Sequence, residues 1–383
     1  MTSPLWTEIR AEFPALARWV YLNTATYGQV PRRAAQAVAR HFAHRDELAC
    51  DDFLSWFDDA DRLRGLLAKL IHCEADDIGF VSSAASALSF LLGGLRWRPG
   101  DRIVTLPDEF PNNIYHQALL AQSGVEMAEV PWERFFEAID SRTRLVAMST
   151  VNYMSGFRPP LREVSRFLRE RGVLFYLDGT QSLGALDFDV REIQPDMLAV
   201  HGYKWLLAPN GAAFFYIHPR LRELLPPSVV GWRSHVDWRS VDHLHHGAPQ
   251  FKSSAEKYEG GMLVFPVLYA MEESVRMILE IGPAVIEARV LGLAAYARER
   301  LRALGASFPE EHAGPAYREC FTSPIVAARF NAVDASVVAR RLRERHVLLS
   351  ARHGNLRVST HFYNNEADVD CLERELRELL PAA

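Results

Sequence analysis

Short apolar runs bounded by turn residues recur along the middle of the chain. They cover residues 78–81, 102–106, 145–149, 173–177, 197–200 and 212–217, and each has the length of a buried β-strand. Helical patterns precede or separate these runs at residues 58–72, 87–95 and 161–171, the first with Leu63, Leu66, Leu67 and Leu70 at three- and four-residue spacing. Strands that alternate with helices predict an α/β fold with a largely parallel sheet.

The pattern changes in the last third of the chain. It is helical over residues 264–304, with a break at Pro283, and then gives strands at 324–330 and 356–359 and helices at 336–345 and 367–380. We therefore expect a large domain over residues 15–255. A smaller α/β domain would contain residues 1–14 and 256–383, joined to the first by an interdomain helix.

One carboxylate and one amine fall at neighbouring strand ends. Asp178 follows the run 173–177, and Lys204 follows the run 197–200. Ligands in open α/β sheets bind outside the carboxyl ends of the strands. A lysine there can form a Schiff base with an aldehyde, and a carboxylate can keep a pyridine nitrogen protonated, which points to pyridoxal phosphate. Taken alone, Asp178 could equally be a strand-end cap and Lys204 a solvated surface amine.

A turn of small residues, 82–86, joins the strand 78–81 to the next helix. Backbone N–H groups and the positive end of the helix dipole can bind a phosphate at such a turn. The same residues would also suit a tight turn with a serine N-cap. The pattern is compatible with a phosphate site without requiring one.

Composition and charge exclude several classes of protein. The 383 residues are 49% apolar and 24% charged, which is typical of a soluble globular protein. The net charge of -5 offers no broad basic face for nucleic acid. No run approaches the ~18 apolar residues of a membrane span. Glu8 and Glu12 stand where a secretory signal would need an apolar core, so we expect a cytoplasmic protein.

Neither the cysteines nor the histidines have metal-site spacing. The four cysteines are scattered at positions 50, 73, 320 and 371, without a CxxC pair. The densest histidine cluster, His243, His245 and His246, has no HExxH or cysteine partner nearby. We expect a polar loop there and no metal.

The two segments that carry Asp178 and Lys204 resemble a known family. DGTQSLGALDFDV, followed by HGYKWLLAPNGAAFFY, is similar to the class V aminotransferase superfamily of fold-type I pyridoxal-phosphate enzymes. Its members include cysteine desulfurases, kynureninases, isopenicillin N epimerases and cysteine C-S lyases. The resemblance extends from about Tyr21 to Leu379. It implies a mostly parallel seven-stranded sheet in the large domain, a small C-terminal α/β domain, bound pyridoxal phosphate and a homodimer with active sites at its interface.

The resemblance also implies roles for individual residues. Residues 83–86, with His201 and Tyr203, would hold the cofactor phosphate; Phe110 would stack on the ring, and Asn152 and Gln181 would bond its phenolic oxygen. The loops with Trp232 and Gly261 would approach the site, the second across the dimer interface. Asn23 would lie at the substrate mouth, and Arg357 would bind the substrate α-carboxylate bidentately. The candidate phosphate ligands are Ser83, Ala84, Ala85 and Ser86.

Departures from the family pattern reduce the number of candidate reactions. Cysteine desulfurases carry their persulfide-forming cysteine just before the arginine, whereas residues 349–354 here read LSARHG, so a sulfur relay is not expected. EFPNNIY and GYKW are closer to kynureninases, which favours a lyase acting on an L-amino acid or its conjugate. An aminotransferase, an epimerase and a non-catalytic sensor remain alternatives. Arg352 and His353 could bind a second polar group of the substrate or be solvated loop residues.

Overall fold

A seven-stranded sheet forms the centre of the protein. The computed structural model describes residues 4–244 and 247–381. In spatial order the sheet contains β2 (Ile78–Val81), β8 (Ala213–Ile217), β7 (Met197–His201), β6 (Leu174–Asp178), β5 (Thr143–Ser149), β3 (Arg102–Thr105) and β4 (Glu126–Glu129). The five strands from β7 to β4 are parallel, and β8 is antiparallel to both its neighbours. The prediction of a mostly parallel seven-stranded sheet is confirmed.

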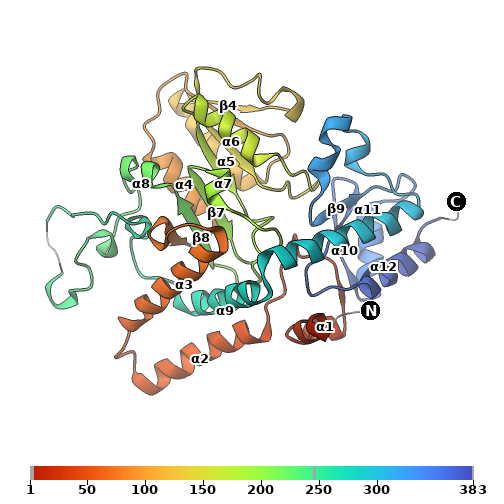
Figure 1. Ribbon diagram of the computed structural model, residues 1–383, viewed down its shortest axis with the longest axis horizontal. Coiled ribbons are helices and arrows are strands. Elements are labelled where there is room, and N and C mark those ends of the chain that lie inside the picture. The colour runs from red at the N-terminus through yellow and green to blue at the C-terminus, as the bar shows by residue number, and fades with distance from the viewer. Residues whose placement is uncertain (1–3, 245–246, 382–383) are drawn as a thin grey trace.

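Both faces of the sheet are buried, because successive strand residues contribute to different hydrophobic clusters. Val146 and Leu177 pack into one cluster, while their neighbours Ala147 and Tyr176 pack into another. The period of two places alternate side chains on opposite faces, and helices cover each face (Figure 1). These helices include α3 (Ser55–Ile71), α4 (Ala84–Gly94), α5 (Pro111–Ala118), α6 (Leu161–Glu170), α7 (Val190–Ile193) and α8 (Pro219–Leu224).

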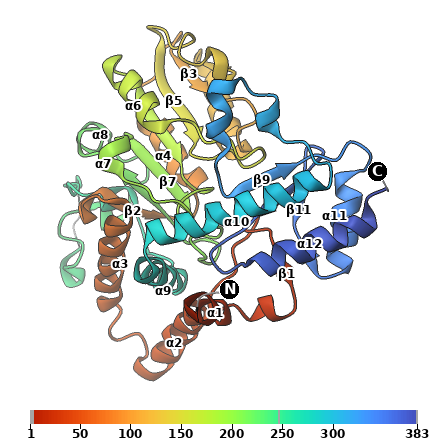
Figure 2. The ribbon, with the colours of Figure 1, turned by 45° about the vertical axis from the view of Figure 1, so that its right-hand side comes forward.

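The C-terminal part has a sheet and a hydrophobic cluster of its own. Its three strands, in the order β11 (Ser350–Arg352), β12 (Asn355–Ser359) and β9 (Ile325–Ala328), are antiparallel. Two long helices, α9 (Phe265–Ile281) and α10 (Pro283–Ala303), lead into it from the large sheet, and α11 (Ala335–Glu344) and α12 (Glu366–Leu379) pack beside it (Figure 2). The predicted break at Pro283 is the start of α10.

The N-terminal segment crosses to this C-terminal part. The short strand β1 (Val20–Tyr21) pairs in parallel with β10 (Val347–Leu348), and α1 (Pro4–Ala11) is tied to α12 by an ion pair between Arg10 and Asp368. Both views place α1 beside α12, while α2 (Arg32–Leu48) runs back along α9. The domain limits expected from the sequence stay a prediction. Within the described residues no helix has the length and apolarity needed to traverse a lipid bilayer.

One element begins earlier than the pattern predicts. Helix α4 starts at Ala84 and not at 87, because the Ser83 side chain accepts a hydrogen bond from the Ser86 backbone N–H and caps the helix. The turn proposed for residues 82–86 is therefore the N-cap and first turn of α4. Strand β4 was not predicted, since its residues are half-buried or exposed and have no apolar run.

Candidate functional site

The candidate residues Asp178 and Lys204 meet at the carboxyl edge of the large sheet. Asp178 is the last residue of β6, and Lys204 follows the end of β7, which pairs with β6. Both are buried, at 6% and 5% exposure. They line a small hollow of about 20 Å³. The other lining residues are Ala84, Phe110, Asn112, Ser149, Tyr153, Thr180, Gln181, His201 and Tyr203.

The buried amine of Lys204 forms no ion pair with the described residues. Among the described residues no carboxylate lies within ion-pair distance of its Nζ, which is 5.2 Å from the centre of the Phe110 ring and 5.3 Å from that of Tyr203. Burial lowers the pKa of Lys204 to about 7, and the charge of Asp178 opposes that shift only in part. A large fraction of this amine is therefore unprotonated near neutral pH and available as a nucleophile or base.

Three distant segments hold the backbone at Lys204. A Cβ on Gly28 would lie 1.9 Å from the Lys204 carbonyl oxygen, and the Gly28 N–H donates to the Tyr203 carbonyl. Gly184, at a φ of +101°, approaches the Trp205 carbonyl in the same way. His361 lies 2.8 Å from that carbonyl through its Nε2, and burial lowers the pKa of His361 to about 3. The neutral imidazole donates this bond because its Nδ1 accepts from the Phe362 N–H.

A second buried carboxyl group, that of Glu109, lies near Asp178. The Asp178 side chain accepts from the Thr180 N–H at 2.9 Å. Across the strand pair, Ser149 lies opposite Asp178 and donates to Glu109 with both its N–H (2.7 Å) and its hydroxyl (2.5 Å). Burial raises the pKa of Glu109. Glu109 was not singled out from the sequence, because its position beside Ser149 depends on the pairing of β3 and β5.

Arg357 is a buried cation beside the same hollow. It is 1% exposed, and its Nε, Nη1 and Nη2 donate to the Ser350 hydroxyl, the Tyr153 carbonyl and the Thr26 hydroxyl at 3.1, 2.6 and 2.5 Å. These acceptors are all neutral, and no described carboxylate forms an ion pair with it. Burial lowers its pKa, and the nearby charge of Arg352 adds to that effect. The guanidinium is placed to bind an anion that the chain itself does not supply.

The amides of Asn152 and Gln181 are already engaged within the chain. Asn152 donates to the Asp108 carbonyl and accepts from Met154 and Ser155, so it shapes the loop after β5 and does not line the hollow. Gln181 lines the hollow, but its oxygen accepts from the Trp205 indole and its nitrogen donates to the Ala25 carbonyl. One N–H of each amide remains for a ligand.

Of the other residues predicted to contact the cofactor or the substrate, some line the hollow and some do not. Phe110, His201 and Tyr203 line it; burial lowers the pKa of His201 to about 4 and raises that of Tyr203 to about 12. Of residues 83–86 only Ala84 does so. Trp232 packs against Phe57 and Trp238, the Gly261 carbonyl accepts from Arg233, and neither lines the hollow. Asn23 is buried, and its side-chain oxygen finds no partner among the described residues.

A comparison of the sequence with models of protein families shows to which family this chain belongs. The model described as aminotransferase class-V matches residues 57–372, which is most of the sequence and contains Asp178, Lys204 and Arg357. The chain belongs to the class V aminotransferase family. The resemblance inferred from the two segments around Asp178 and Lys204 is confirmed.

Relatives within the family differ in what their names say they do. A probable cysteine desulfurase of Methanothermobacter thermautotrophicus is 25% identical, over 97% of each chain. Isopenicillin N epimerase of Streptomyces clavuligerus is 28% identical over 98% of each. Among solved structures, a complex of the cystine C-S lyase C-DES with cysteine persulfide has a TM-score of 0.85 at 22% identity and covers 95% of this chain and 98% of that one. The structural likeness establishes a shared fold.

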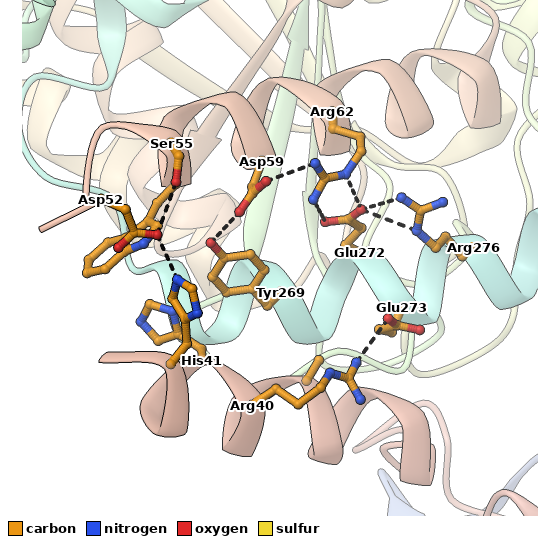
Figure 3. A pocket seen from close by; sticks show the side chains of 13 residues that line it. Arg40, His41, Asp52, Ser55, Asp59, Arg62, Tyr269, Glu272, Glu273 and Arg276 are labelled. Carbon is orange, nitrogen blue, oxygen red and sulfur yellow. Dashed lines mark hydrogen bonds and ion pairs between the residues drawn. The ribbon is translucent and has the colours of Figure 1, made fainter. Parts of the chain in front are cut away.

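A larger hollow than the one at Lys204 lies elsewhere in the protein, between α2, α3 and α9. Its volume is about 680 Å³ and its lining is strongly charged (Figure 3). Those charges bind one another: Arg62 pairs with Asp59 and Glu272, and Arg40 with Glu273. No three metal-ligating side chains of the described chain converge on one point. Of the histidine cluster, His243 lies in an exposed turn, and His245 and His246 lie outside the described residues.

Proposed function

We propose that the protein is a pyridoxal-phosphate-dependent lyase that cleaves a bond to the β-substituent of an L-amino acid. The observation that carries the proposal is that Asp178 and Lys204, both buried, meet at adjacent strand ends, where burial lowers the pKa of Lys204 to about 7. Family membership and the solved C-DES variant with glycine covalently linked to its PLP cofactor support the same cofactor here.

The residues around the hollow fit this cofactor by their chemistry. When bound, pyridoxal phosphate supplies an aldehyde for an amine and a ring that withdraws electrons. Lys204 is the amine, Asp178 the acceptor for a protonated ring nitrogen, and the first turn of α4 the phosphate site.

Substrate orientation and proton movement are then assigned to two residues. Arg357 binds the α-carboxylate, because an anion there would compensate a buried guanidinium that has only neutral partners. Lys204 takes the proton from the substrate Cα, since a pKa of about 7 suits a general base at neutral pH. The neutral His361 and the close approach of Gly28 hold the Lys204 backbone in place for this transfer.

The positions of the cysteines favour cleavage of the bond to the β-substituent without transfer of sulfur to an enzyme cysteine. No cysteine lines the hollow, and residues 349–354, which precede Arg357, contain none. Burial raises the pKa of Cys73 to about 12 and also raises that of Cys320, so neither is a ready thiolate. A persulfide-carrying mechanism therefore lacks its nucleophile at this site.

We further infer that the enzyme acts as a homodimer in the cytoplasm. Exposed apolar side chains gather in residues 229–264, the segment whose loops contain Trp232 and Gly261. They are Val229, Val230, Val236, Leu244, Phe251, Met262 and Val264. A second copy would bury them. A molecular mass near 43.4 kDa by light scattering at micromolar concentration would contradict the dimer.

Product analysis tests the proposed reaction. The purified enzyme, supplied with pyridoxal phosphate, is given S-substituted L-cysteines, and pyruvate and ammonia are measured with time. We expect equal amounts of both from the wild type and neither from Lys204→Ala. A keto acid that retains the whole substrate side chain would indicate transamination, and racemised substrate would indicate epimerisation, as the name of the Streptomyces relative suggests. Either result would overturn the lyase assignment.

A further inference from the structure

A second cavity lies next to the Lys204 hollow along the same edge of the sheet. It has a volume of about 270 Å³, and we call it the side pocket. Its walls are mainly Leu106, Pro107, Trp132, Met154, Phe157 and Phe321. The first five follow the carboxyl ends of β3, β4 and β5, and Phe321 comes from the C-terminal part, which covers the pocket.

The side pocket and the Lys204 hollow share two walls. In the loop after β3, Asp108 lines the pocket and Phe110 lines the hollow; in the loop after β5, Asn152 lines the pocket and Tyr153 the hollow. The Asn152 amide joins these loops by donating to the Asp108 carbonyl at 3.1 Å. These two loops therefore border both cavities, and a substrate held at Tyr153 and Lys204 would lie across them from the pocket.

The lining of the pocket suits an apolar group. Met154, Phe157 and Phe321 are only half-buried, so apolar surface faces an open cavity. Trp132 is 9% exposed, and its indole N–H finds no acceptor among the described residues. Apolar cavities of ~150 Å³ already hold benzene, so this one has room for a phenyl or branched alkyl group.

We propose that the side pocket receives the β-substituent of the substrate and selects amino acids whose substituent ends in an aromatic or branched aliphatic group. This inference rests on the proposed function, because it takes Arg357 as the carboxylate site and Lys204 as the base. It predicts that substrates with a small substituent, such as S-methyl-L-cysteine, gain nothing from the pocket. S-benzyl-L-cysteine should bind through it.

Filling the pocket provides the test. Ala313 lines it from the C-terminal part and is not in the Lys204 hollow, so Ala313→Trp should raise the KM for S-benzyl-L-cysteine by about tenfold or more and leave that for S-methyl-L-cysteine unchanged. Ala295→Trp, on the exposed face of α10, is the matched control and should alter neither. Equal KM changes for both substrates in Ala313→Trp, or no change for either, would overturn the proposal.

A binding measurement separates this proposal from the choice of reaction. The cofactor-free protein is titrated with S-benzyl-L-cysteine while tryptophan fluorescence is recorded, and the change should be lost in Trp132→Phe and weakened in Ala313→Trp. If the enzyme releases no pyruvate but these signals appear, the pocket stands and the lyase assignment fails. If the wild type shows no saturable signal, or Trp132→Phe keeps it in full, the pocket assignment fails whatever the reaction.

Discussion

Two buried clusters of charged side chains differ in whether the described residues supply carboxylate partners for the cations. In the first, which we call the paired cluster, Arg64 and Arg233 lie 2.6 and 2.9 Å from the carboxylate of Glu259, and Arg233 also pairs with Glu256. In the second, the unpaired cluster, Lys204 and Arg357 have no carboxylate within ion-pair distance among the described residues. Both clusters are almost inaccessible to water.

The difference separates a structural role from a ligand-binding one. Burying a charge is unfavourable unless a partner compensates it. In the paired cluster the chain supplies the carboxylates, and Glu259 also accepts from the Phe80 N–H, which joins Glu259 to β2. In the unpaired cluster the compensation is missing from the protein, and a bound cofactor and substrate would provide it. Each cluster therefore responds differently to substitution.

The largest expected effect is on turnover when the unpaired amine is removed. Lys204→Ala should lower kcat by at least about 10²–10⁴-fold, because the base at the substrate Cα is lost. Lys257→Ala is the matched control: Lys257 is also buried, but its amine donates to the Arg222 carbonyl. Steady-state pyruvate release measures both. Comparable losses of kcat in the two variants would contradict the assignment of Lys204 as the base.

In the paired cluster the expected loss is in stability. Glu259→Gln leaves two buried guanidinium groups without their carboxylate and should reduce the free energy of unfolding by about 3–5 kcal/mol. Urea unfolding followed by circular dichroism measures the change. Glu126→Gln removes an exposed carboxylate that pairs with Arg142 and Arg102 and should cost less than about 1 kcal/mol. A Glu259 variant as stable as the Glu126 variant would contradict the structural role.

Substitution of the unpaired guanidinium should affect substrate affinity. Arg357→Met is expected to raise the KM for the amino-acid substrate by about 10–100-fold, since a charge-assisted bidentate contact is lost. The affinity for pyridoxal phosphate should not change. Arg329→Met, an exposed arginine beside β9, is the control. A raised dissociation constant for the cofactor with an unchanged KM would assign Arg357 to the wrong ligand.

The fourth expected effect is a pH dependence of stability in the cofactor-free protein. The pKa of Lys204 is about 7 in the folded state and lies near its ordinary 10.5 when unfolded. Between these values the unfolded chain binds the proton and the native Lys204 does not, so this residue makes stability rise with pH by up to about 1.4 kcal/mol per unit. The difference between wild type and Lys204→Met in urea unfolding isolates it. A difference that is flat from pH 7 to 10 would refute the lowered pKa.

How much of this could be predicted depends on how far each contact reaches along the chain. Asp178 and Lys204 could be found because each follows its own apolar strand, and hydrophobic periodicity is local. Arg357 came only from the family resemblance, since nothing in the pattern near it indicates burial among neutral acceptors. His361 and Gly28 were not predicted as supports of Lys204 because His361 meets Trp205 across 156 residues. Such contacts are decided by tertiary packing.

Asn152 and Gln181 illustrate a second limit. Their residue types suit a phenolic oxygen, but the sequence could not reveal that both amides also hold protein segments together. The side pocket could not be predicted from the sequence either, because its walls come from four separate segments that only the fold brings together.

The most direct test of the account is to identify which lysine captures the cofactor. The chain has only Lys69, Lys204, Lys252 and Lys257, so the result is easily mapped. Purified protein is mixed with one equivalent of pyridoxal phosphate, its absorption spectrum is recorded before and after borohydride, and the modified peptide is identified by mass spectrometry. The account predicts a visible-edge band that reduction removes and label on Lys204 alone. Label on Lys69, Lys252 or Lys257 with Lys204 unmodified would contradict it.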